Sequence, residues 1–89
     1  MKTLPLIFTR KGWQHRQLAR HGNVAIYERS RPLRTPHFEL VRVGSHKGYD
    51  VAGKHIDAAE TYPSSEQLGS RAWTFNDRAV AEERFRQLT

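Results

Sequence analysis

The C-terminal segment constrains the fold most strongly, because it forms the one clear amphipathic helix of the chain. Ala81, Phe85 and Leu88 recur at helical spacing with charged residues between them. A helix of about three turns with a single apolar stripe must bury that stripe against a sheet or a partner. Thr74 and Asp77 form a T-x-x-D pattern, which predicts a capping box at the start of this helix.

Short strand-like segments separated by turn signals come before the helix. Trp13–Arg20 and Val24–Arg29 flank the turn-forming residues His21-Gly22-Asn23, so together they predict a β-hairpin. A loop follows at Arg31–Pro36, where two prolines remove donors from any strand ladder. His37–Val43 predicts a third strand.

The apolar residues of this third strand change parity part-way along. Phe38 and Leu40 would face one side, and Val41 and Val43 the other. This change predicts either a β-bulge or burial of the strand on both faces.

The following segments predict weaker elements. Gly44–Gly48 is interpreted as a turn, and Tyr62–Gly69 as a short helical turn. Lys54–Tyr62 is interpreted as a fourth strand, although its Asp-Ala-Ala-Glu run is also compatible with a helix.

Strands followed by one covering helix predict an α+β fold. We expect a small antiparallel sheet of three to four strands, arranged as a meander and covered by one C-terminal helix. Residues 1–89 are too few for two domains, so we interpret the chain as a single domain. Trp73 and Phe75 precede the helix and are expected to anchor it to the sheet; the alternative is an exposed aromatic patch for a protein partner.

Basic residues are concentrated in the first half of the chain, although the net charge is only +6. Residues 1–47 hold ten Lys and Arg against two acids, a balance of +8. Residues 48–89 hold five bases against seven acids, a balance of −2. This asymmetry predicts a polyanionic partner for the first half.

Guanidinium groups match phosphate geometry bidentately, and aromatic rings between them stack on bases. We therefore predict a nucleic-acid-binding set of six arginines and one tryptophan: Trp13, Arg16, Arg20, Arg29, Arg31, Arg34 and Arg42. His15 is a second candidate for base stacking.

Even spacing along strands places these arginines in pairs. Arg16 and Arg20 are expected to share one face, as are Arg29 and Arg31, with Arg34 and Arg42 close by. The alternative is a merely solvated face on which some arginines pair with two glutamates of the first half, Glu28 and Glu39.

Few residues favour catalysis or cofactor binding. Gly48–Lys54 matches GxxxxGK, but His55 follows where a P-loop needs Ser or Thr. Ser64 and Ser65 lie beside a proline without a G-x-S-x-G elbow, as in ordinary turns. The chain has no cysteine, which excludes disulfides and thiolate metal sites. The five histidines lack metal-ligand spacing. We expect no catalytic residues, no metal and no cofactor.

The C-terminal string resembles a group of small uncharacterised bacterial and phage proteins. Tyr62–Gly69 (YPSSEQLG), Ala72-Trp73-Thr74 and the A-x-x-x-F-x-x-L helix are similar to ends that read roughly YPSSEQWG, GWT and A-x-x-x-F-x-x-L. Leu68 stands where that group often has Trp, and Ala72 where it often has Gly. The group has no assigned activity, so the resemblance implies shape and a phage origin rather than chemistry. The layout is also similar to WGR domains, although the Trp-Gly-Arg signature is missing.

These observations predict a small non-enzymatic protein that binds DNA or RNA through its basic half. The alternative function is a protein–protein adaptor or inhibitor, such as a phage-type accessory factor, that presents the same basic face to an acidic protein. An open sheet edge also favours a homodimer. The apolar run Leu4–Phe8 is too short for a leader, and no segment reaches transmembrane length. We therefore expect a cytoplasmic protein without a membrane partner.

Overall fold

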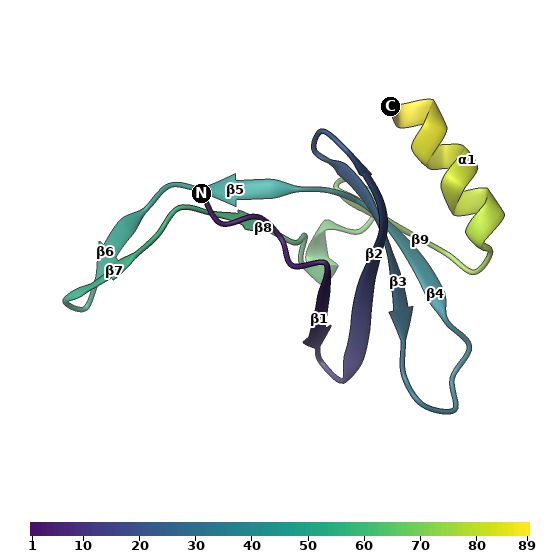
Figure 1. The fold of residues 1–89 in the computed structure, drawn as a ribbon, viewed down its shortest axis with the longest axis horizontal. Coiled ribbons are helices and arrows are strands. Elements are labelled where there is room, and N and C mark those ends of the chain that lie inside the picture. Colours follow the sequence, from purple (N-terminus) through teal and green to yellow (C-terminus); the bar gives the residue numbers. More distant parts are fainter.

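The computed structural model describes residues 1–89, apart from the side chain of Ser65. Five antiparallel strands form the main sheet in the order β1-β2-β3-β4-β9, and one helix, α1, packs against it (Figure 1). Their bounds are β1 Ile7–Arg10, β2 Trp13–His21, β3 Val24–Ser30, β4 His37–Arg42, β9 Ala72–Phe75 and α1 Arg78–Leu88. The predicted α+β meander with one covering helix is confirmed, with five strands in place of the expected three to four.

The two strands that sequence patterns missed lie at the edges of the sheet. A two-residue turn joins β1 to β2, and both its residues, Lys11 (φ 52°) and Gly12 (φ 82°), have the positive φ of a type I′ hairpin. Strand β9 pairs with β4, where Thr74 lies opposite Glu39. The predicted capping box is therefore wrong, because Thr74 belongs to a strand. The residue that caps α1 is Asp77, whose side chain accepts a hydrogen bond from the Ala79 amide at 2.8 Å.

A β-bulge in β2 changes which residues share a face. The register with β3 shifts between Gln17 and Ala19, so Leu18 is an extra residue. Before the bulge Arg16 lies opposite Glu28, and after it Arg20 lies opposite Ala25, on the other face. The prediction that Arg16 and Arg20 share a face was wrong for this reason.

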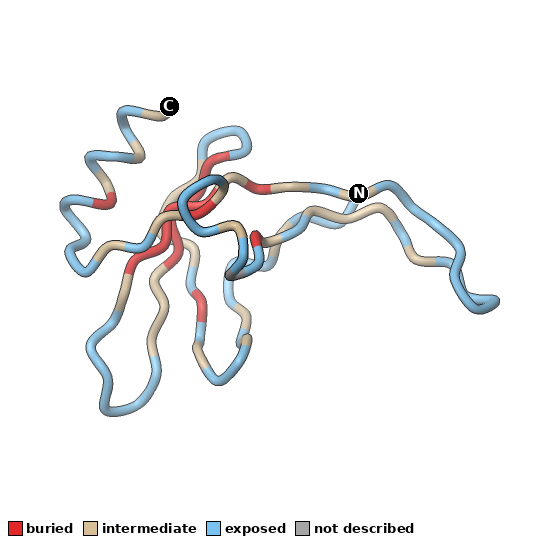
Figure 2. Tube along the Cα trace, turned by 180° about the vertical axis from the view of Figure 1, so that it is seen from behind, coloured by how far each residue is buried: buried red, intermediate tan, exposed pale blue. Residues whose placement is uncertain are grey.

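The central strands are buried on both faces. On the helix face, Val24, Ile26 and Leu40 pack with partly buried side chains that include those of Trp73, Phe75, Phe85 and Leu88. On the opposite face, which we call the helix-free face, the cluster contains Ala25, Tyr27, Val41, Val43 and Ala72. Figure 2 shows the buried residues gathered along these strands. Because β3 and β4 pair without a register shift, the parity change in the third strand reflects burial on both faces.

The apolar stripe of α1 lies on the sheet as predicted. Ala81 is fully buried, and Phe85 and Leu88 pack on the helix-face cluster together with Trp73 and Phe75. The predicted anchoring role of the two aromatic residues is therefore confirmed. Among the described residues, no helix combines the length and the apolar character needed to cross a membrane.

A long two-stranded arm leaves the sheet between β4 and β9 (Figure 1). Its strands pair in the orders β5-β8 and β6-β7, with bounds β5 Gly44–His46, β6 Tyr49–Val51, β7 Lys54–Ile56 and β8 Ala59–Thr61. The predictions of a turn at 44–48 and of one strand at 54–62 were therefore wrong in detail. The first segment contains strand β5, and the second is divided into two strands, β7 and β8. The GxxxxGK match lies on the tip hairpin, where Ala52 (φ 51°) and Gly53 (φ 78°) form the turn. The predicted helical turn is the 3-10 helix η1, Ser65–Gln67.

An ion pair holds the base of the arm to the sheet. Nη1 and Nη2 of Arg20 each donate to the carboxylate of Glu60 at 2.6 Å, and Nε of Arg20 donates to the Gly22 carbonyl at 2.8 Å. Glu60 also accepts from the backbone amide of Leu4 at 3.0 Å. The Arg20 guanidinium, together with this amide, lowers the pKa of Glu60 from 4.5 to about 2. The ionised form of Glu60 therefore ties three separate segments together.

We expect the Glu60→Gln variant to lose about 1–2 kcal/mol of unfolding free energy at pH 7, the usual contribution of charge-assisted hydrogen bonds. The pKa of Glu60 is lower in the folded state, so its contribution is complete above about pH 4.5 and is lost as the pH falls toward about 2. Urea unfolding at several pH values measures this contribution, because the difference in unfolding free energy between wild type and variant should shrink over that pH range. A gap that stays constant down to pH 2 would contradict the role given to this pair.

Candidate nucleic-acid interface

Trp13 lies at the centre of a cluster of cationic side chains on the helix-free face. The guanidinium of Arg29 is 5.0 Å from the centroid of the Trp13 ring, and that of Arg31 is 5.2 Å from it. The ring of His37 lies 5.8 Å away in a tilted arrangement. Arg29 and Arg31 do share a face, as their spacing predicts.

Stacking on Trp13 prepares these arginines to bind an anion. A guanidinium stacked on an aromatic face is attracted by the ring quadrupole, and its N–H groups stay at its edge, where they can reach a phosphate. The Trp13 ring thus has two guanidinium groups packed on it and is partly exposed. That Trp13 stacks on bases stays a prediction.

Two turns lie side by side beyond this cluster. The guanidinium of Arg31 lies 3.7 Å from the point where a side chain at Gly12 would begin, so the 31–36 loop touches the β1–β2 turn. Lys11 and Arg34 are both exposed on these turns. We call this surface the basic end of the sheet and define it by six residues: Arg10, Lys11, Trp13, Arg29, Arg31 and Arg34.

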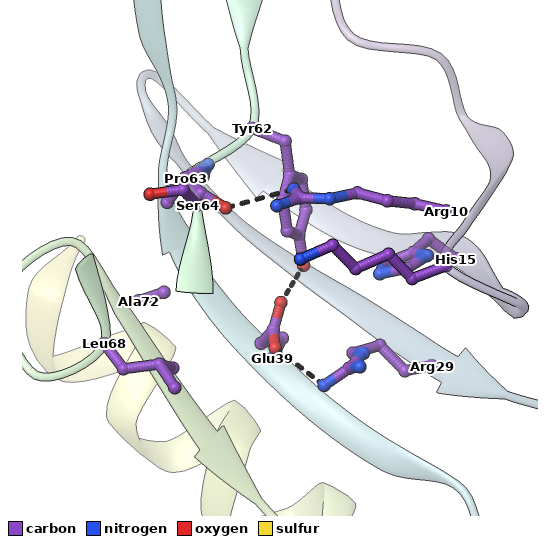
Figure 3. Close-up of a pocket in the computed structure, with 10 residues that line it drawn as sticks. Arg10, His15, Arg29, Glu39, Tyr62, Pro63, Ser64, Leu68 and Ala72 are labelled. Atoms are coloured by element: carbon purple, nitrogen blue, oxygen red, sulfur yellow. Dashed lines mark hydrogen bonds and ion pairs between the residues drawn. The ribbon is translucent and has the colours of Figure 1, made fainter. Parts of the chain in front are cut away.

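A small hollow of about 90 Å³ opens beside the basic end (Figure 3). Glu39 lies at its centre and is buried. Its carboxylate accepts a hydrogen bond from the hydroxyl of Tyr62 and forms an ion pair with Nη1 of Arg29 at 3.1 Å. Nε of Arg29 is buried and has no hydrogen-bond partner among the described residues. The hollow is therefore held by a buried network that retains one unused donor.

Two further cations line the same hollow. Arg10 donates to the Pro63 carbonyl at 3.2 Å and lies over the Tyr62 ring at 5.6 Å. Lys11 lines the hollow from the β1–β2 turn. With Arg29, three cations surround the single carboxylate of Glu39. Burial, followed by the nearby carboxylate, raises the pKa of Tyr62, which keeps the phenol protonated as a donor. The hollow thus carries a net positive charge.

His15 lies under the hollow and is almost completely buried, with 3% of its surface exposed. Its ring stacks on Phe8 with a centroid distance of 4.6 Å, and its Nδ1 lies 3.1 Å from the Trp13 carbonyl. Since a carbonyl only accepts, Nδ1 carries the proton. Burial lowers the pKa of His15, so the ring is neutral at pH 7. The prediction that His15 stacks on bases was wrong, because its faces are already covered.

Three predicted arginines lie away from the basic end. Arg16 pairs with Glu28 at 3.1 Å on the helix face. Arg20 is engaged by Glu60 at the base of the arm. Arg42 also lies on the helix face, 6.0 Å from the centroid of the Trp73 ring, so it is not beside Arg29 and Arg31 as expected. The predicted pairing of arginines with Glu28 and Glu39 is present, and the structure brings together only Trp13, Arg29, Arg31 and the loop that carries Arg34.

Sequence reasoning missed three contributors to this surface: Arg10, Lys11 and Tyr62. It named Glu39 as a partner for arginine, but did not indicate that this carboxylate is buried. Arg10 and Lys11 had a weak signal in Gly12, because glycine readily adopts the positive φ that a tight turn requires. Tyr62 is far from Glu39 in sequence, and no local pattern indicates that they meet.

Comparisons with known proteins identify no relative. No protein-family model, curated protein or solved structure matches this chain. The resemblance of the C-terminal string therefore stays a prediction. Among the described side chains, no group of three or more potential ligands is arranged so that it could hold a metal ion.

Proposed function

We propose that this chain is a small non-enzymatic protein that binds nucleic acid through the basic end of its sheet. The observation that carries the proposal is the Arg31 guanidinium, which is held on the Trp13 ring beside two further exposed cations, Lys11 and Arg34, while Arg29 on the same ring is paired with Glu39. The nearest carboxylate, Glu39, is buried and already satisfied by Tyr62 and Arg29. An approaching polyanion would thus meet cations without competing surface acids from this cluster.

Four cations at this end have no carboxylate partner among the described residues: Arg10, Lys11, Arg31 and Arg34. Each can neutralise one phosphate and release the counterions condensed on it. The proposal therefore predicts about four phosphate contacts and a slope of about −3.6 for log K against log salt on duplex DNA.

Fluorescence anisotropy with labelled single- and double-stranded oligonucleotides tests the proposal. Between about 50 and 200 mM salt, four contacts predict a loss of about 150-fold in duplex affinity. The same titration with RNA oligonucleotides shows whether the protein prefers DNA or RNA. If no oligonucleotide binds at the lowest salt, the basic end is not a nucleic-acid site.

A protein partner is the second candidate function, and the arm is the observation that favours it. The tip hairpin exposes Tyr49 and Val51, and an isolated two-stranded hairpin is marginally stable in water. In this alternative the basic end contacts an acidic protein, and the exposed tip of the arm gains contacts with the same partner. Two results together would favour this function over the first. A pull-down would still retain one protein after nuclease treatment, and no oligonucleotide would bind in the anisotropy titration.

A further inference from the structure

The loop between β3 and β4 presents one large apolar side chain at its tip. Leu33 is fully exposed, and it has the most exposed side chain among the large hydrophobic residues that the structure describes. It is flanked in sequence by Pro32 and Arg34, with Arg31 one residue further back. An apolar side chain surrounded by cations at the apex of a loop is poorly placed for any role in the core.

The backbone of this loop is also unusual. The Arg34 amide donates to the Arg31 carbonyl at 3.3 Å, which closes a four-residue turn with Pro32 and Leu33 in the middle. Leu33 has φ 61°, in the left-handed region where this turn position normally has Gly or Asn. A leucine in this region carries backbone strain, and such strain is concentrated at functional sites. Pro32 restricts the turn, so the leucine is held outward.

The cations around Leu33 indicate what it would enter. Arg31 and Arg34 are both exposed and flank the turn that carries Leu33, and the Arg31 side chain reaches the β1–β2 turn, which carries the exposed Lys11. Proteins that bend duplex DNA combine phosphate-binding cations with apolar wedges, often leucine, that enter between stacked base pairs. Duplex DNA offers phosphates and an apolar base stack next to each other, which matches this arrangement.

We propose that Leu33 is a wedge that inserts between two base pairs of duplex DNA while Arg31 and Arg34 hold the phosphates on either side. This inference rests on the proposed function and deepens it, since it names the duplex and the base step as the target. Flexible pyrimidine–purine steps such as TA unstack most easily, so the wedge should prefer them.

The test uses the full chain and duplexes that carry 2-aminopurine beside a TA step, because this base fluoresces more strongly when it is unstacked. Wild type should raise the fluorescence on binding. Leu33→Gly, which suits the positive φ and keeps every arginine, should abolish the rise and lower affinity about tenfold, as expected for losing one buried leucine. Its salt slope should stay unchanged. Leu33→Met keeps an apolar wedge and should preserve the fluorescence rise.

The outcomes separate this inference from the proposed function. Salt-dependent binding by wild type without any fluorescence rise overturns the wedge and leaves the proposed function standing. A Leu33→Gly variant that raises fluorescence as wild type does also overturns the wedge. Absence of any duplex binding overturns the wedge, and the proposed function falls with it only if single-stranded DNA and RNA also fail to bind.

Discussion

Replacing Arg31 and Arg34 together with glutamine should lower the affinity for duplex DNA about 60-fold at 0.1 M salt. A log–log slope of about −0.9 per contact means that each phosphate contact contributes about eightfold at this concentration. Both side chains are exposed, and neither belongs to the buried clusters, so the fold should be unaffected. The salt slope should also become shallower by about 1.8. Anisotropy titrations of the double variant measure both quantities.

A matched control separates local contact from overall charge. Arg84→Gln with Arg86→Gln removes the same two charges from exposed positions on α1, where Arg86 is paired with Glu83. This control should keep most of the wild-type affinity. Equal losses in the two double variants would show that only the net charge matters, and the basic end would not be a defined site.

The Glu39→Ala variant should lose about 3 kcal/mol of unfolding free energy, because removing one partner of a buried ion pair leaves the other charge uncompensated. The side chain of Glu39 is only 9% exposed, and its loss deprives both Arg29 and Tyr62 of their acceptor. Nε of Arg29 already lacks a partner, so the guanidinium would retain even fewer hydrogen bonds. Thermal unfolding should show a midpoint lower by roughly 12–24 °C in a domain of this size.

Glu28→Ala is the control for this prediction. Glu28 also pairs with an arginine across neighbouring strands, but its partner Arg16 is 54% exposed. Exposed pairs contribute less than about 1 kcal/mol. If both alanine variants lose the same stability, the network around Glu39 does not depend on burial as described.

The sheet order was largely predictable because its signals are local. The Gly22 turn joins two alternating segments, and the structure places β2 and β3 there in antiparallel register. The parity change near Val41 correctly limited the third strand to a bulge or burial on both faces. The edge strands β1 and β9 were missed, since each has only four residues. Strands this short carry too few alternations to stand out from a loop.

Only some of the predicted binding residues come together in the structure, and the reason is again strand regularity. The even spacing of Arg29 and Arg31 correctly predicted a shared face, because β3 is regular up to its last residue, Ser30. Both side chains reach the Trp13 ring. The same argument failed for Arg16 and Arg20, because the bulge at Leu18 inserts one residue and exchanges the faces. A bulge leaves no reliable mark in a single sequence, yet it reverses every face assignment beyond it.

Sequence patterns alone were enough to predict the α+β class, the main hairpin, the covering helix with its apolar stripe, and the concentration of positive charge in the first half. Each of these depends on neighbouring residues or on composition. Which cations are free and which are already neutralised depends instead on contacts between distant parts of the chain. Arg20 meets Glu60 and Glu39 meets Tyr62 across long stretches of chain, and these meetings depend on strand register and on burial from two sides. The charge pattern predicts a polyanionic partner, and the packing leaves Arg31 and Arg34 without a carboxylate partner among the described residues.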